Sequence, residues 1–425
     1  MNFEKTEAFA AKMDAEDTLK EFRSKFFIPK TTDGQEVAYF TGNSLGLQPK
    51  NTRENIEHEL KGWETLGVEG HFHSNRRPWF HYHEYSKNTL SKIVGAKELE
   101  VVSMNNLTSN LHFMMVSFYR PEGKRFKILM ESGAFPSDQY AVESQVRFHG
   151  YDPESAILEL KPRKDENLIR NEDIKNIIDE QGDEIALILL PGIQYYTGQL
   201  FDMESITKWG HEKGANVGFD LAHAAGNVPM HLHDWDVDFA VWCSYKYLNS
   251  GPGNVSGVFV HEKHSDSKEI PRFAGWWGYD EEERFLMKKG FKPMPGADGW
   301  QLSNVNVIAS AAHLASLELF GEVGMEKLRA KSILLTAYFE FLLSEINKNE
   351  KLLSIITPKE EEGRGCQLSL FFHKDGKKIF DQLTENGVIV DWREPCVIRA
   401  APVPLYNSFK DVYRFYKILK ATVNG

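Results

Sequence analysis

Short apolar runs separated by helical segments dominate the middle of the chain. From about residue 54 to about residue 260, helical patterns alternate with apolar runs that predict strands at Lys127–Met130, Ile157–Leu160, Glu184–Leu190, Val217–Phe219, Phe239–Cys243 and Gly257–Val260. Such alternation is typical of an α/β fold built on a mixed or parallel sheet.

The pattern changes beyond Asn304. It predicts two long helices and then two strands, at Val307–Phe320, Met325–Ile346, Cys366–Phe372 and Val388–Asp391. A last helix is expected to begin at a Ser408 cap, with Asp411 three residues on and an apolar stripe behind it. These elements predict a small α+β unit. The first forty or so residues are expected to pack with it, because nothing in them supports a separate core.

The amino-acid composition argues against several classes of protein. The chain has 425 residues and a net charge of -11, and no block of Lys and Arg stands out, which opposes a nucleic-acid partner. Its three cysteines, Cys243, Cys366 and Cys396, are scattered, which fits a reducing compartment. The charged N-terminus has no apolar leader segment, and no window reaches the ~18 apolar residues of a membrane span. We therefore expect a cytoplasmic protein with no membrane partner.

One lysine and one aspartate suggest the chemistry. Lys246 lies in Ser244-Tyr245-Lys246-Tyr247-Leu248 just after an apolar run, and Asp220 ends the apolar run before it. A lysine that forms an imine and an aspartate that keeps a pyridinium nitrogen protonated are the groups a protein supplies to pyridoxal 5′-phosphate. Parallel neighbouring strands would bring both residues to one sheet edge.

Each residue also has a purely structural interpretation. Lys246 alone could be a surface lysine and Asp220 alone a helix N-cap. Phe135 alone would pack in a core, and His223 alone could be either a hydrogen-bonded helix histidine or a site residue.

The order of the motifs along the chain resembles the kynureninase family, in the class V aminotransferase branch of fold-type-I pyridoxal-phosphate enzymes. The resemblance spans nearly the whole chain and rests on these blocks: Gly42 to Pro49, Arg77-Pro78-Trp79, Asn106 to His112, Phe135 to Asp138, Gln194 to Gln199, Asp220 to Gly226, Ser244 to Leu248, Gly275 to Gly278, Leu302-Ser303-Asn304 and Ile398 to Asn407. It implies a large, mostly parallel seven-stranded sheet domain over residues 50–305, with residues 1–49 and 306–425 forming a smaller α+β domain.

The resemblance also implies roles for individual residues. Lys246 would attach the cofactor covalently and transfer protons, Asp220 would bind the pyridinium nitrogen, and Tyr245 would contact the phosphate and shuttle a proton. Tyr247 is expected to pack structurally. The other implied cofactor contacts are Leu107, Thr108, Phe135, Pro136, Ser137, Asp138, His223, Trp276 and Asn304. Among these, Thr108 would face the phosphate at a helix start, and Phe135 would cover the cofactor ring.

Substrate contacts follow from the same resemblance. Arg399 matches an arginine that binds the substrate α-carboxylate, a task suited to a guanidinium fork. Ser44, Phe72 and Asn304 complete the implied substrate site, and Trp276 and Asn304 are expected to come from the neighbouring subunit of a homodimer. Proline at position 191 departs from the family pattern, which has a hydroxyl residue contacting the cofactor there. Phe72 or His71 stands at a variable position, so preference for a ring hydroxyl stays open.

The implied activity is hydrolysis of the Cβ–Cγ bond of L-kynurenine or 3-hydroxy-L-kynurenine, giving L-alanine and an anthranilate, in tryptophan catabolism by the kynurenine pathway, which leads to NAD biosynthesis. No metal is expected.

Three alternatives are open to test. A cysteine desulfurase needs a nucleophilic cysteine on a mobile loop, and neither Cys366 nor Cys396 is well placed. A metal hydrolase is suggested by the paired histidines at 71 and 73, 81 and 83, and 231 and 233, which lack an accompanying general base. A ligand sensor in a transcription regulator would need a basic DNA-binding segment, which the sequence lacks.

Overall fold

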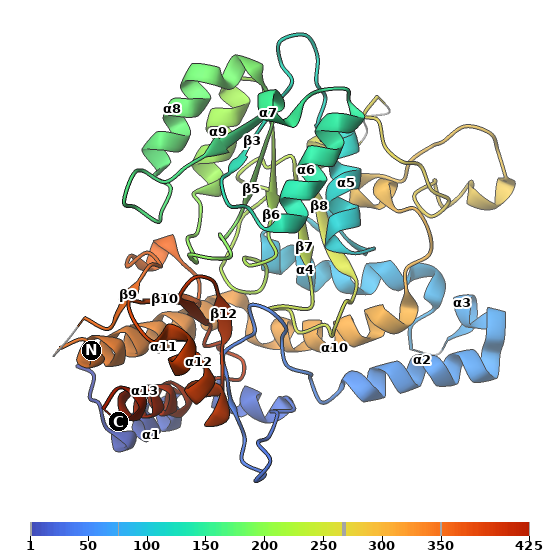
Figure 1. Cartoon of the computed structure of the whole chain (residues 1–425). Coiled ribbons are helices and arrows are strands. Elements are labelled where there is room, and N and C mark those ends of the chain that lie inside the picture. Colours follow the sequence, from blue (N-terminus) through green and yellow to red (C-terminus); the bar gives the residue numbers. More distant parts are fainter. Residues whose placement is uncertain (1, 75, 266–268, 349–350, 425) are drawn as a thin grey trace.

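A seven-stranded sheet forms the centre of the larger part of the molecule (Figure 1). The computed structural model describes residues 2–74, 76–265, 269–348 and 351–424. In spatial order the strands are β2 (Val101–Met104), β8 (Ser256–Val260), β7 (Phe239–Cys243), β6 (Asn216–Asp220), β5 (Ile185–Pro191), β3 (Lys127–Glu131) and β4 (Ile157–Leu160). The five strands from β7 to β4 are parallel to one another, whereas β8 is antiparallel to both of its neighbours.

Helices cover both faces of this sheet, which explains why the central residues of its inner strands are mostly apolar. Along β5, Ile188 and Leu190 point into one core and Leu187 and Leu189 into the other. One face carries α4 (Lys87–Val94), α8 (Asn171–Gln181), α9 (Met203–Glu212) and α10 (Val307–Val323), and the other carries α5 (Leu107–Phe118) and α6 (Pro136–Phe148). Helix α2 (Thr52–Leu66) packs along α10, and the short helices α3 (Gly70–His73) and α7 (Pro153–Ala156) lie at the periphery.

A smaller sheet and the two chain ends form the rest of the molecule. Its four strands have the order β12 (Asp391–Arg393), β13 (Val397–Ala400), β10 (Leu368–Phe372) and β9 (Leu353–Ile355). They share a core with α1 (Glu7–Glu16), α11 (Met325–Ile346), α12 (Gly376–Glu385) and α13 (Phe409–Asn424). N-terminal residues contact this unit, since β1 (Ala38–Tyr39) pairs with β11 (Val388–Ile389) and α1 packs on α13. Leu19 and Phe26 pack instead in a core of the larger sheet.

The cap predicted for the last helix is present. Ser408 Oγ accepts a hydrogen bond from the backbone N–H of Asp411 at 3.1 Å, and Asp411 Oδ2 accepts one from the N–H of Ser408 at 3.0 Å. This reciprocal capping box satisfies two backbone donors at the start of α13.

Two strand predictions need correction. The single strand expected over Val388–Asp391 is wrong: β11 bonds to β1 in one sheet, and β12 bonds to β13 in another. The chain changes partner between them, which an apolar run does not reveal. Strand β2 was not predicted, because it is short and follows the charged segment Lys97–Glu100.

No single helix among the described residues is long and apolar enough to cross a membrane. Helices α10 and α11 pass that test of length and composition only as a pair, and the pair is bent by 83°.

Candidate active site

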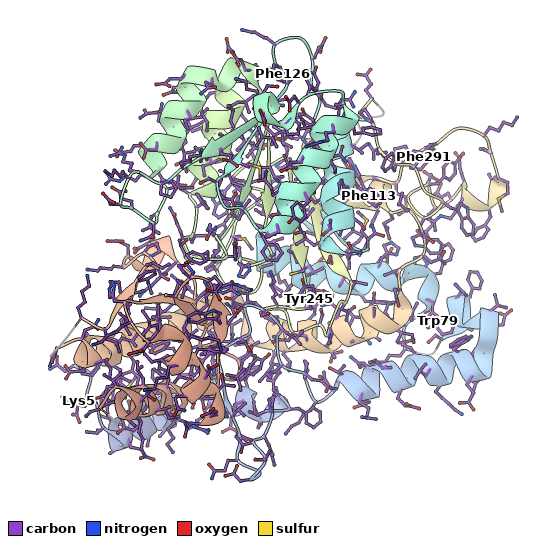
Figure 2. The ribbon with its side chains drawn as sticks, viewed as in Figure 1. Lys5, Trp79, Phe113, Phe126, Tyr245 and Phe291 are labelled. Carbon is purple, nitrogen blue, oxygen red and sulfur yellow. The ribbon has the colours of Figure 1, made fainter. Side chains whose placement is uncertain are left out.

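Four parallel strands end at one cavity. Glu131, Pro191, Asp220 and Cys243 are the last residues of β3, β5, β6 and β7, and all four line it. The rest of the lining is Leu107, Thr108, Phe135, Ser137, Asp138, Ile193, Tyr195, Ala222, His223, Tyr245 and Lys246. Figure 2 shows Tyr245 near the middle of the molecule, where the larger part meets the smaller. This is the sheet edge at which open α/β folds bind ligands.

Lys246 follows β7 and points to His223. The Lys246 Nζ lies 3.0 Å from His223 Nε2 and 5.7 Å from the centroid of the Phe135 ring. Burial, together with the positive charges of Lys246, Arg399 and Arg393, lowers the pKa of His223 well below its usual range. The imidazole is therefore neutral, with Nε2 accepting from the lysine ammonium. That tautomer puts a proton on Nδ1, which is buried and has no hydrogen-bond partner among the described residues.

Three carboxyl groups share the deep side of the cavity. Asp220 Oδ1 accepts a hydrogen bond from the N–H of Ala222 at 2.6 Å, and the side chains of Asp220 and Asp138 are hydrogen-bonded. Burial and the negative charge of Asp220 raise the pKa of Asp138 well above its usual range, so Asp138 carries the shared proton. Burial, followed by Asp220, raises the pKa of Glu131 to about 8. A cationic ring nitrogen beside Asp220 would stabilise the ionised form of this carboxylate.

The other side of the cavity suits an anion. Helix α5 begins at Leu107, and the Asn106 cap accepts a hydrogen bond from the N–H of Ser109 at 3.0 Å. Leu107 and Thr108 are the first two helical residues, so their N–H groups belong to the positive end of the helix dipole. Tyr245 is hydrogen-bonded to Cys243, and burial, followed by Cys243, raises the pKa of the tyrosine. Tyr245 therefore remains a hydroxyl donor at neutral pH.

These groups fit pyridoxal 5′-phosphate, which has a basic ring nitrogen, an aldehyde and a phosphate. Asp220 and the protonated Asp138 suit the ring nitrogen, Lys246 suits the aldehyde, and the start of α5 with Thr108 and Tyr245 suits the phosphate. His223 contacts Lys246 in the cavity lining, beside the position that suits the aldehyde.

The structure does not bring every predicted site residue to this cavity. Pro136 is the first residue of α6 and is exposed. Trp276 is 46% exposed and Phe72 is 54% exposed, and neither lines the cavity. The exposed Asn304 lines a different cavity, together with Trp63, His71 and Trp79.

Ser44 and Arg399 are not among the residues that line the cavity. Ser44 is exposed in a loop that packs against the lysine segment, where the N–H of Gly46 donates to the Tyr245 carbonyl at 2.8 Å. A Cβ at position 46 would lie 2.3 Å from the Lys246 carbonyl oxygen, so only glycine allows this approach. Arg399 is 1% exposed and donates to the carbonyl of Tyr195 at 2.8 Å.

Sequence reasoning missed several lining residues. Glu131 and Cys243 were not identified as site residues, although each ends a predicted strand or directly follows one. The signal that could have found them is their common position at the carboxyl ends of parallel strands. Pro191, left out of the expected set, also lines the cavity. Tyr195 lines it too, and its ring packs edge-on against Phe135 with the centroids 5.3 Å apart.

The features that suggested other enzymes lie elsewhere. Cys366 is buried, and burial raises the pKa of its thiol to about 12, the opposite of an activated nucleophile. His233 Nδ1 lies 2.9 Å from the buried Glu100, and His261 stacks on His233 with the ring planes 7° apart. Nearly parallel rings do not direct their in-plane lone pairs at one metal ion.

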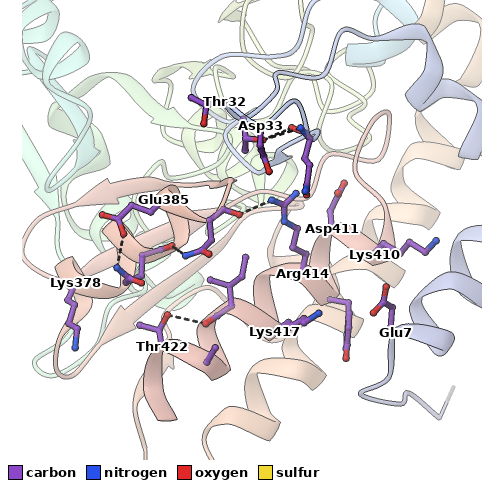
Figure 3. Close-up of a pocket in the computed structure, with 17 residues that line it drawn as sticks. Glu7, Thr32, Asp33, Lys378, Glu385, Lys410, Asp411, Arg414, Lys417 and Thr422 are labelled. Atoms are coloured by element: carbon purple, nitrogen blue, oxygen red, sulfur yellow. Dashed lines mark hydrogen bonds between the residues drawn. The ribbon is translucent and has the colours of Figure 1, made fainter. Parts of the chain in front are cut away.

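Figure 3 shows a larger groove of about 1240 Å³, away from the predicted chemistry, where α12 and α13 meet the loop around Asp33. Its lining is polar, and the Arg414 guanidinium is already bonded to the carbonyls of Glu36 and Asn386 at 2.6 and 2.7 Å. It contains none of the predicted site residues.

Known proteins resemble this chain in sequence and in fold. A family model described as "Kynureninase C-terminal domain" matches residues 328–419. A protein named "Kynureninase" from Flavobacterium psychrophilum is 58% identical, covering 99% of this chain and 99% of its own length. Another of that name from Mus musculus is 48% identical, covering 99% of this chain and 94% of its own.

Among solved structures, a cysteine desulfurase from Thermococcus onnurineus NA1 is 17% identical with a TM-score of 0.78, over 96% of this chain and 98% of its own. The cysteine desulfurase CsdA from Escherichia coli is 16% identical with a TM-score of 0.75, over 95% of this chain and 98% of its own. At this identity the structural likeness bears on the fold alone, and it confirms the expected fold-type-I architecture. The sequence identity decides the family: the chain belongs to the kynureninase family.

Proposed function

We propose that this chain hydrolyses the Cβ–Cγ bond of L-kynurenine or 3-hydroxy-L-kynurenine to L-alanine and an anthranilate, with pyridoxal 5′-phosphate as cofactor. The observation that carries the proposal is the cavity in which Lys246, His223, Asp220 and Asp138 meet, in a chain of the kynureninase family. When bound, the cofactor withdraws electrons from the substrate carbons whose bonds change.

The chain's own groups have distinct tasks. Lys246 is the base that takes and returns the proton at the substrate Cα, and the neutral His223 at 3.0 Å holds its Nζ in place. Asp220 stays ionised against a protonated ring nitrogen, supported by the Ala222 N–H and by the proton on Asp138. Tyr245 keeps its hydroxyl proton at neutral pH and can deliver it to the carbon released by hydrolysis.

The substrate would lie between this cavity and residues from several segments. Arg399 would bind the α-carboxylate, and Ser44 lies in the loop that docks against Tyr245. Phe72 is apolar and His71 and Asn304 are polar, so the pocket for the aryl ring has no single character.

Product analysis tests the proposed function. The purified protein, loaded with pyridoxal 5′-phosphate, should release equimolar L-alanine and the corresponding anthranilate from both kynurenines. We expect kcat/KM values within about a hundredfold of each other, because Phe72 offers no hydrogen bond to a ring hydroxyl and a pocket without such a bond discriminates weakly. A ratio beyond about a thousandfold would mean that a polar contact controls the ring pocket. If neither substrate yields L-alanine, the proposed function is wrong.

We also infer a homodimer with shared sites. Trp276 and Asn304 are exposed and do not line their own chain's cavity. Near Trp276, Phe72, Phe285, Leu286 and Met287 are all more than half exposed, an apolar surface of the kind that a second copy would cover. The second copy would then supply its Trp276 and Asn304 to the cavity around Lys246.

Mixing two inactive variants tests this sharing. Lys246→Ala and Asn304→Ala chains should each be nearly inactive alone, and subunit exchange should restore activity by forming one intact site per mixed dimer. About a quarter of wild-type activity is expected from equal amounts, because half of the dimers are mixed and each has one working site. Mass spectrometry of differently labelled chains verifies the exchange. No recovery after proven exchange would mean that each chain builds its site alone.

A further inference from the structure

The arginine expected to bind the substrate carboxylate already has an internal carboxylate partner. Arg399 and Asp391 stand directly opposite each other in the antiparallel pair β13 and β12, and Arg399 Nη2 donates to Asp391 Oδ2. Arg399 Nη1 donates to the Tyr195 carbonyl at 2.8 Å, which fixes the plane of the guanidinium. An Asp391–Arg399 pair by itself would be neutral and would compete with any incoming carboxylate.

A second arginine changes this balance. Arg393 lies two residues after Asp391, on the same face of β12, and its Nη2 is 3.3 Å from the same Asp391 oxygen. These contacts therefore join two guanidinium groups to one carboxylate, leaving one net positive charge. Both arginines lower the pKa of His223, so both charges act on the cavity that contains Lys246.

Both arginines also have a donor that is free to bind an anion. The Nε atoms of Arg399 and Arg393 are both buried, and neither has a hydrogen-bond partner among the described residues. Arg399 itself is only 1% exposed. Buried charged donors that lack a partner are costly unless a ligand completes them.

We propose that Asp391 and Arg393 belong to the substrate-carboxylate subsite as positioning residues. Asp391 holds Arg399 in place, and Arg393 shares Asp391 so that Arg399 keeps a charge for the α-carboxylate of the substrate. The ligand class is an α-amino acid with a free carboxylate. This inference rests on the proposed function, because that function supplies the substrate.

Charge-altering variants test it in opposite directions. Arg393→Gln makes the cluster neutral and should raise KM for L-kynurenine on the order of tenfold, with kcat changed little. Asp391→Asn keeps an oxygen acceptor for Arg399 but adds a net charge, so it should not raise KM. The double variant Asp391→Asn/Arg393→Gln restores the original net charge and should return KM to within about threefold of wild type. Arg393→Lys keeps the cation and is the matched conservative control.

The α-carboxamide of L-kynurenine separates charge from structure. The KM for this amide should be the same in wild type and in Arg393→Gln, because the amide brings no carboxylate to the subsite. The inference is overturned if Arg393→Gln raises KM equally for the acid and the amide, or leaves KM for the acid unchanged. It is also overturned if the double variant has a higher KM than either single variant. Thermal melting of each variant shows whether it is folded. If Arg393→Gln does not fold, the KM values of Arg393→Lys and of the double variant test the inference.

Failure of the proposed function gives a different result. If the wild-type protein cleaves neither acid nor amide, the function itself is wrong. Calorimetric titration with L-alanine then still tests the subsite in the cofactor-loaded protein. The subsite is supported if Arg393→Gln binds L-alanine about tenfold more weakly than wild type and the double variant restores the affinity. Equal affinity in wild type and Arg393→Gln overturns it.

Discussion

Replacing Lys246 with alanine should reduce turnover of L-kynurenine by more than about a thousandfold while leaving the fold intact, because no other amine lines the cavity among the residues that the structure describes. The side chain contacts His223 and Phe135 at the cavity wall and is only partly buried, so its removal leaves the two cores unchanged. Initial rates and thermal melting measure the two effects separately.

Two controls sharpen this result. Lys208 is exposed on α9, far from the cavity lining, and Lys208→Ala should keep wild-type activity. Adding a small primary amine to Lys246→Ala should recover part of the lost rate if the amine itself is what the reaction lacks. Wild-type turnover by a well-folded Lys246→Ala protein would remove Lys246 from the mechanism.

Asp220 should show the second largest effect. We expect Asp220→Ala and Asp220→Asn to lose about 10²–10³-fold in kcat, because neither keeps a negative charge against the ring nitrogen. Asp220→Glu keeps the charge at a different reach and should lose much less. The visible spectrum of the loaded protein, titrated with pH, should also change in these variants, because the charge on the ring nitrogen affects the group that absorbs. An unchanged rate and spectrum in Asp220→Ala would show that another acid performs this role.

Asp220→Asn, which lowers activity, should raise the stability of the cofactor-free protein. Burial raises the pKa of Asp220, and its charge raises the pKa values of Asp138 and Glu131, so the ionised group is unfavourable in the cofactor-free fold. Raised folded-state pKa values for the two neighbours mean that stability is greatest at low pH and falls as pH rises toward those values. Asp220→Asn should therefore melt at a higher temperature than wild type without cofactor, and the difference should widen from pH 5 to pH 8.

If both effects are found, the acid cluster serves function at the expense of stability. A fold selected only for stability would not place Glu131, Asp138 and Asp220 together at the ends of β3, α6 and β6. Burial raises the pKa values of all three carboxyl groups in the cofactor-free protein, and a cation beside Asp220 would favour its ionised form.

The sequence by itself determined the local structure and the position of the chemistry. Continuous apolar runs predicted β7 and most of β5, because strands buried on both faces have no polar alternation. The Ser408 cap set the start of α13, since capping depends on residues three positions apart. Asp220 was recognised because it directly follows a predicted strand and Lys246 because it lies three residues after another, and the ends of parallel strands share one edge.

Tertiary structure decided what depends on contacts between distant segments. The sequence could not show that the run from Val388 changes sheets, because hydrogen-bond partners are chosen by packing. It could not show that Asp391 faces Arg399, since antiparallel register is set by the whole small sheet. Nor could it show that Trp276 and Asn304 lie outside the cavity of their own chain. Local patterns follow from propensity and periodicity within a few residues, whereas the charge balance of the site arises only when four strand ends and two sheets meet.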